Sequence, residues 1–242
     1  MLRALSSASV PEGHLPVSVP VIAVDGPSGS GKGTVCRILS EKLRWHLLDS
    51  GALYRLAALA GAARGLDAAD EAGHAALAAA LDVRFEVDAS GGERVLLDGR
   101  DVTRELRAET TGNMASVVAV MASVRTALLG RQRAFAVPPG LVADGRDMGT
   151  VVFPSAGLKV FLTASAEERA RRRYNQLKEK GLAANLAGLS QEILERDRRD
   201  SARSVAPLKP ATDAVVIDST GIPVDDVVNR ILVLAREAFP AI

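Results

Sequence analysis

One glycine-rich segment restricts the possible fold of this chain more than any other feature. Residues 21–34 read V-I-A-V-D-G-P-S-G-S-G-K-G-T, an apolar run typical of a buried strand, then a glycine-rich loop and the start of a helical pattern. Glycine adopts backbone conformations closed to other residues, so such a loop can wrap a phosphate group, and a helix N-terminus adds partial positive charge. Residues 26–32 match G-x-x-x-x-G-K, the pattern of a phosphate-binding loop or P-loop. The alternative interpretation is a glycine-rich turn that binds no nucleotide.

The residue types in this loop predict how a nucleotide would be held. Lys32 is expected to reach the β and γ oxygens of a triphosphate and to stabilise the charge that develops during transfer. In such loops a hydroxyl after the lysine helps to hold Mg²⁺; here Gly33 takes that place and the hydroxyl follows at Thr34. The expected nucleotide-binding residues are Gly26, Pro27, Ser28, Gly29, Ser30, Gly31, Lys32, Gly33 and Thr34.

The chain alternates short apolar runs with helical patterns. Five buried strands are expected, at residues 21–25, 46–48, 141–144, 159–163 and 214–218. Helices are expected at residues 33–44, 52–64, 124–136, 167–180, 190–199 and 224–239. This alternation indicates an α/β fold with a mostly parallel sheet, whose ligands bind beyond the carboxyl ends of the strands. Aspartates follow or end four of the strands: Asp25, Asp49, Asp144 and Asp218.

A different pattern, typical of antiparallel strands, interrupts this order. In residues 82–88 apolar and charged side chains alternate, as in a half-exposed strand. Asp98 and Gly99 separate residues 94–97 from residues 100–103, which is a strong hairpin signal because both turn residues need positive φ. Gly91 and Gly92 are expected to form the preceding turn, and the alanine-rich residues 57–80 a plain helix.

These patterns predict a division of the chain into segments. They are a flexible tail at residues 1–16, core segments at 17–65, 114–163 and 187–242, an inserted lobe with its own antiparallel sheet at 66–113, and an arginine-rich helical segment at 164–186 that is bounded by Gly181. The tail contains charges and prolines, so it lacks the continuous apolar core of a secretory signal.

Composition excludes several classes of protein. A net charge of +1 provides no whole-molecule attraction for nucleic acid or an anionic membrane. The longest weakly polar run, residues 112–124, falls short of the roughly 20 residues of a membrane helix. The lone Cys36 rules out an intrachain disulfide, and the three histidines are not grouped with other zinc ligands. We therefore expect a cytoplasmic monomer with no nucleic-acid or membrane partner.

Four motifs together resemble the successive motifs of bacterial cytidylate kinases, which are P-loop nucleoside monophosphate kinases. They are G-P-S-G-S-G-K-G-T at 26–34, L-D-S-G-A-L-Y-R at 48–55, A-D-G-R-D-M-G-T at 143–150 and R-D-R-R-D-S-A-R at 196–203. The resemblance covers residues 19–234 and implies transfer of the γ-phosphoryl group of Mg·ATP to CMP, and also to dCMP, in pyrimidine nucleotide metabolism. It also implies a parallel-sheet core flanked by helices, a nucleotide-binding role for the inserted lobe at 66–113, and a helical lid at 164–186.

The charges of the motifs agree with such a transfer independently of the resemblance. Two phosphorylated nucleotides bring several negative charges together, and each unit pair at 4 Å costs about 4 kcal/mol at an effective dielectric of about 20. Guanidinium suits this task because its planar fork binds two phosphate oxygens and stays protonated. The motifs contain no histidine, which fits an acceptor phosphate oxygen that is already ionised and needs no general base.

The resemblance also implies roles for individual residues. Acceptor binding is expected of Ser50, Tyr54, Arg55, Ser116, Arg125, Arg146, Asp147, Arg196, Asp200 and Arg203. Catalysis is expected of Lys32, Arg146 and the lid arginines Arg169, Arg172 and Arg173, which share one helix face. Thr34 and Asp144 are the expected Mg²⁺ residues, the latter through water. For the cytosine base, Asp147 can accept from N4 while Ser116 and Arg125 donate to N3 and O2.

Each assignment has a plainer alternative. Ser50 can be a simple helix cap, Arg146 and Asp147 an ion-paired turn, and the arginines of residues 167–173 a solvated face. Ser116 and Arg125 can merely begin helices. At the level of function, the alternatives are another small-molecule P-loop kinase or a basic nucleic-acid-binding module. A GTPase is disfavoured because the chain has no N-K-x-D segment.

Overall fold

The structure is a computed structural model of the chain and describes residues 19–87, 93–179, 183, 185–203, 205–240 and 242. It contains two compact units, one of Ala52–Leu128 and one formed by Val19–Gly51 with Leu129–Ile242. Three expectations lie outside the described residues: the tail at 1–16, the turn at Gly91 and Gly92, and the lid boundary at Gly181.

The unit that contains the glycine-rich loop is built on a parallel sheet. Its strands are β1 (Val21–Asp25), β2 (His46–Asp49), β6 (Leu141–Asp144), β7 (Leu158–Thr163) and β8 (Val215–Asp218). They pair in the order β2-β6-β1-β7-β8, and every pairing is parallel. All five predicted strands are confirmed. β1 and β6 are buried along their whole length, which explains why their sequences lack polar alternation.

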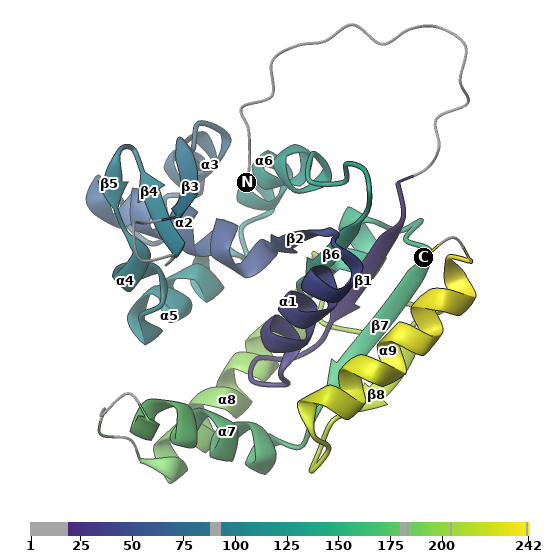
Figure 1. Ribbon diagram of the computed structural model, residues 1–242. Helices are drawn as coiled ribbons and strands as arrows, with labels where there is room; N and C mark the ends of the chain where they lie inside the picture. Colours follow the sequence, from purple (N-terminus) through teal and green to yellow (C-terminus); the bar gives the residue numbers. More distant parts are fainter. Residues whose placement is uncertain (1–18, 88–92, 180–182, 184, 204, 241) are drawn as a thin grey trace, which may run out of the picture. The chain divides into compact units, whose positions relative to one another are not determined.

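Four long helices belong to this unit: α1 (Lys32–Leu43), α7 (Ala166–Glu179), α8 (Leu186–Ser201) and α9 (Val224–Ala238). α1 and α9 lie side by side against the sheet (Figure 1). Their apolar side chains, among them Leu39 and Ile231, belong to one core with Ile22, Val160 and Ile217 of the sheet. α7 and α8 pack against each other. Cys36 lies fully buried in the same core.

The strand order determines where this unit can bind a ligand. After β1 the chain builds β2 and β6 on one side of it, and later β7 and β8 on the other. In such sheets the crevice lies at the carboxyl end of the strand where the order reverses. That strand is β1, which runs directly into the glycine-rich loop.

One helix of this unit was not expected from the sequence. η1 (Met148–Val152) directly follows the D-G-R-D part of the third motif. Its hydrogen bonds include the wide pattern of a π-helix, with Phe153 N–H donating to the Met148 carbonyl at 2.7 Å. Isolated π turns of this kind are rare and often occur at functional sites.

The other unit combines helices with a small antiparallel sheet. It contains most of α2 (Ser50–Ala63) and α3 (Glu71–Ala79), β3 (Val83–Val87), β4 (Glu93–Leu97), β5 (Arg100–Asp101), α4 (Thr103–Leu106), α5 (Glu109–Val118) and most of α6 (Ala122–Arg133). The strands pair in the order β3-β4-β5. The predicted hairpin is confirmed, with Asp98 at φ 50° and Gly99 at φ 77°.

Two local expectations in this unit are wrong. The strand expected at 100–103 ends at Asp101, because the Asp101 carboxylate accepts hydrogen bonds from the backbone and hydroxyl of Thr103 and α4 begins there. The single helix expected at 57–80 is broken between α2 and α3. Gly65 lies at φ 66°, and the Asp70 side chain caps α3 by accepting from Gly73 N–H.

The weakly polar run at 112–124 is divided between two helices. α5 ends at Val118 and α6 begins at Ala122. Ser116 lies inside α5, so the alternative that it begins a helix is wrong, whereas Arg125 does lie in the first turn of α6. In the part of the chain that the structure describes, no single helix is long and apolar enough to cross a membrane.

Candidate functional site

The glycine-rich loop has the backbone that a phosphate-binding loop requires. Gly26, Gly29 and Gly31 have φ values of 146°, 77° and 93°, which other residues rarely adopt. A Cβ on Gly26 would lie 2.0 Å from the Leu162 carbonyl oxygen, so no larger residue fits there. Gly31 caps α1, whose first residue is Lys32. The predicted order of strand, loop and helix is confirmed.

Two arginines of α7 hold the outer side of this loop. Arg169 Nη1 donates to the Ser28 carbonyl at 3.1 Å, and Arg172 Nη1 donates to the Ser30 carbonyl at 3.2 Å. The N–H of a trans peptide points opposite to its carbonyl. These bonds therefore direct the amides of Gly29 and Gly31 away from α7, as a concave anion-binding loop needs.

Arg169 is held by protein groups on several sides. It is 4% exposed, forms a two-bond ion pair with Asp197 at 3.0 and 2.6 Å, and donates through Nε to the Ala164 carbonyl at 3.0 Å. In the described structure Arg169 thus braces the P-loop. Its expected role on a closing lid stays a prediction. Sequence reasoning missed Asp197, although it lies in the R-D-R-R-D motif.

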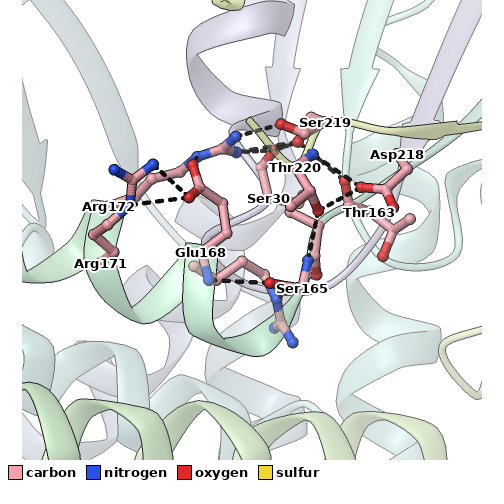
Figure 2. A network of polar contacts seen from close by, with 11 residues as sticks. Ser30, Thr163, Ser165, Glu168, Arg171, Arg172, Asp218, Ser219 and Thr220 are labelled. Atoms are coloured by element: carbon pink, nitrogen blue, oxygen red, sulfur yellow. Dashed lines mark hydrogen bonds and ion pairs between the residues drawn. The ribbon is translucent and has the colours of Figure 1, made fainter. Parts of the chain in front are cut away.

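Arg172 belongs to a polar network shown in Figure 2. Its Nη2 donates to the Ser219 carbonyl at 2.5 Å, and its Nε donates to Glu168 at 2.8 Å. Next to it, Ser165 N–H donates to the Thr220 hydroxyl at 2.9 Å. The network ties the P-loop and α7 to the end of β8. The i to i+4 spacing of Glu168 and Arg172 predicts their pair, but no motif signals Ser219.

Arg173, the third expected lid arginine, forms a hydrogen bond within its own helix. Its Nη1 donates to Gln176 at 3.0 Å within the same helix. Arg169 and Arg172 therefore reach the P-loop carbonyls, whereas the hydrogen bond between Arg173 and Gln176 stays within α7.

Lys32 and Asp144 are buried charges at the start of α1 and the end of β6. Lys32 is 5% exposed and its Nζ donates to the Pro27 carbonyl at 2.7 Å. Burial lowers the pKa of Lys32 to about 7 and raises that of Asp144 to about 7, while the attraction between the two opposite charges offsets part of each shift. A Cβ on Gly33 would lie 3.5 Å from Asp144 Oδ2, so Asp144 lies beside the position where other P-loops carry a hydroxyl.

The donor set near Asp144 fits a Mg²⁺ ion that arrives with a nucleotide. Among the described residues, no group of three or more His, Cys, Asp or Glu side chains could hold a metal. Mg²⁺ commonly binds one or two carboxylates together with substrate phosphates and water. The Asp144 carboxylate and the exposed Thr34 in the first turn of α1 are oxygen donors of that kind.

Two expected acceptor-side arginines of this unit, Arg146 and Arg203, contact the buried carboxylate of Asp200. Asp200 is 1% exposed, accepts from Arg146 Nε at 3.1 Å and pairs with Arg203. Arg203 lies past the end of α8 at Ser201, so it does not share that helix with Arg196 and Asp200. Arg203 still pairs with Asp200, which lies three residues earlier in the chain. Ser50 lies near the same segment, since a Cβ on Gly145 would be 2.8 Å from Ser50 Oγ.

Four of the expected residues belong to the other unit: Tyr54, Arg55, Ser116 and Arg125. The Arg125 guanidinium lies 5.7 Å from the centre of the Tyr54 ring and donates to the Ala119 carbonyl at 3.2 Å. Arg55 donates to the Leu106 carbonyl at 2.8 Å. The buried Ser116 hydroxyl has no hydrogen-bond partner among the described residues, whereas most buried polar groups have one.

Comparisons with known proteins agree with the motifs. A profile of the family described as Cytidylate kinase matches residues 22–237. A cytidylate kinase of Pseudomonas syringae pv. tomato is 60% identical over 217 residues, covering 89% of this chain and 95% of the relative. A cytidylate kinase of Colwellia psychrerythraea is 57% identical over 219 residues, covering 90% and 97%. A solved gluconokinase from Sinorhizobium meliloti aligns over 91% of this chain and 94% of its own, with a TM-score of 0.45 and 19% identity.

Proposed function

The chain belongs to the cytidylate kinase family, and we propose from this premise how its residues transfer a phosphoryl group from ATP to CMP. The protein is a nucleoside monophosphate kinase, a phosphotransferase. The observation that carries the proposal is the arrangement at one sheet edge, where the P-loop follows β1 and the D-G-R-D turn follows the neighbouring strand β6. We propose dCMP as a second acceptor.

The P-loop and Lys32 would bind the donor. The amides that the α7 arginines turn inward receive phosphate oxygens, and the N-terminus of α1 adds partial positive charge. Lys32 leaves the Pro27 carbonyl and places its ammonium against the β and γ oxygens, where negative charge accumulates in the transition state. Because the ammonium is buried, its interaction with this charge is strong.

Asp144 and Thr34 would hold Mg²⁺ with the ATP phosphates. Bound there, the ion would neutralise phosphate charge and help to align the γ-phosphoryl group with its acceptor. Asp144 supports such binding only as a carboxylate, and an adjacent divalent cation favours that charged form over the protonated one that burial favours.

The acceptor phosphate would be bound by Ser50, Arg146 and Arg203, and the ribose by Asp200 and Arg196. Asp200 holds Arg146 and Arg203 before the substrate arrives, which lowers the cost of ordering both guanidinium groups. The attacking oxygen of CMP is already ionised near pH 7, so none of these residues has to remove a proton. The base-reading roles of Asp147, Ser116 and Arg125, the roles of Tyr54 and Arg55, the cytoplasmic location and the monomeric state stay predictions.

A coupled assay of ADP formation across CMP, dCMP, UMP and AMP tests the proposal. We expect turnover that requires Mg²⁺ and an acceptor, with CMP and dCMP used at least about tenfold better than UMP or AMP, the range that one well-placed hydrogen-bond set can discriminate. Equal use of AMP would indicate another nucleotide kinase. Turnover with no dependence on any of these acceptors would contradict the proposal.

A further inference from the structure

We infer that Asp25 and Arg133 are positioning residues for the acceptor site, because they hold the two ends of η1, the short helix that directly follows Arg146 and Asp147. This inference rests on the proposed function, in which Arg146 binds the phosphate of CMP and Asp147 is predicted to read its base. Sequence reasoning assigned neither Asp25 nor Arg133 to the site.

Asp25 holds the N-terminal end of η1. Its side chain is buried, with Oδ1 accepting from Met148 N–H and Oδ2 accepting from Gly149 N–H, both at 2.8 Å. The first N–H groups of a helix have no partner within the helix. A carboxylate that takes two of them satisfies both donors and places negative charge at the positive end of the helix.

Arg133 holds the opposite end. Its Nε donates to the Val152 carbonyl at 3.0 Å and its Nη2 donates to the Val151 carbonyl at 3.2 Å. These are carbonyls of the last turn, which also lack partners within a helix. η1 therefore has an acid at its N-terminal end and a base at its C-terminal end, the arrangement that both its unpaired groups and its dipole favour.

The close approach of Asp25 depends on Gly149. A Cβ at this position would lie 3.1 Å from Lys159 Cδ and 3.4 Å from Asp25 Oδ2. Lys159 is itself held by Asp213 at 2.8 Å, so it cannot simply move aside. The backbone of η1 thus fits closely between the Asp25 carboxylate and the Lys159 stem.

Asp25 also links the proposed ATP-binding loop to the turn that carries the proposed CMP-binding residues. It is the last residue of β1 and is followed by Gly26 of the P-loop, while the helix that it holds begins one residue after Asp147. One side chain therefore fixes the turn that carries Arg146 and Asp147 relative to the loop that would carry ATP. A displacement of η1 would move both acceptor-side residues, because no flexible segment separates them from it.

Asp25→Asn and Arg133→Gln test this inference from the two ends of the helix. Asp98→Asn, in the hairpin turn of the other unit, and Arg37→Gln, on the exposed face of α1, are matched controls for the loss of each charge. For every protein we would measure kcat and KM for CMP, the Kd of an ATP analogue, and amide hydrogen exchange of a peptide covering residues 147–153. Exchange reports on the helix even without a substrate.

Both variants are expected to exchange faster at residues 147–153 and to lose about tenfold or more in kcat/KM for CMP, mainly through KM, with the Kd for the ATP analogue changed less than about twofold. Unchanged exchange in both variants would overturn the inference that Asp25 and Arg133 hold η1. Faster exchange with unchanged KM for CMP, or an equal loss for CMP and the ATP analogue, would overturn the positioning role. The wild-type CMP turnover in the same assay tests the proposed function separately.

Discussion

At the scale of single residues, the P-loop lysine is the group whose loss should affect chemistry most. Lys32→Ala is expected to lower kcat by roughly 10²-fold or more, the effect of removing one preorganised electrostatic contact. Folding should not suffer, because a buried ammonium with a lowered pKa is itself costly. The control variant is Lys42→Ala, which removes an exposed lysine from the last turn of α1. Near-normal turnover of Lys32→Ala would remove this residue from the mechanism.

Asp25 predicts a specific dependence of stability on pH. Burial raises the pKa of Asp25 to about 6 against the pull of its two backbone hydrogen bonds, so the native state holds this proton more tightly than the unfolded chain does. The contribution of Asp25 to the free energy of unfolding therefore falls as pH rises from about 4 to about 6, by roughly 3 kcal/mol at 1.36 kcal/mol per pKa unit.

Chemical denaturation of wild type and Asp25→Asn at several pH values checks this sign. The difference between the two proteins cancels the other titrating groups. We expect wild type to lose stability relative to Asp25→Asn between pH 4 and pH 6 and then to level off. A difference that stays constant with pH would mean that the pKa of Asp25 is not raised.

At the scale of elements, the ion pair between α7 and α8 should support ATP binding. Asp197→Asn weakens the partner of the buried Arg169, which braces the Ser28 carbonyl of the P-loop. We expect a lower melting temperature and an increase of about tenfold in KM for ATP, with a smaller change in KM for CMP.

The matched control for that variant is Glu195→Gln, an exposed carboxylate on the same helix, which should change neither quantity. If Asp197→Asn raised the KM values for both substrates equally, the ion pair would be supporting the whole unit and not the P-loop in particular.

The elements that could be predicted from the sequence are those whose pattern is local and long. The apolar runs of β1 and β6 and the periodic helices α1 and α9 follow from burial on the faces that their side chains cover. η1 could not be predicted, since its five residues depend on Asp25 and Arg133, which lie far away in the chain. The break between α2 and α3 could have been predicted from Gly65 and the capping Asp70.

The candidate site divides in the same way. Residues inside motifs, such as Lys32 and Asp144, could be predicted because the motif itself states their spacing. Asp197 and Ser219 could not be assigned, because no local sequence pattern indicates their contacts. Asp197 binds Arg169, 28 residues away, and Ser219 binds Arg172, 47 residues away.

At the scale of the whole molecule, a nearly neutral chain places several cations in and next to its P-loop. The net charge is +1, yet Lys32, Arg146, Arg169 and Arg172 all lie in the unit that contains the P-loop. Several are paired with a carboxylate, as Arg146 is with Asp200 and Arg169 with Asp197. Such paired cations can bind phosphate groups locally without giving the protein a general affinity for polyanions.

The identity of the labelled product tests the central claim most directly. Wild-type protein would be incubated with Mg²⁺, CMP and ATP labelled in its γ-phosphoryl group, and the nucleotides separated. The account predicts that the label appears in CDP, in amounts equal to the ADP formed. Label released as inorganic phosphate at the same rate with and without CMP would contradict it.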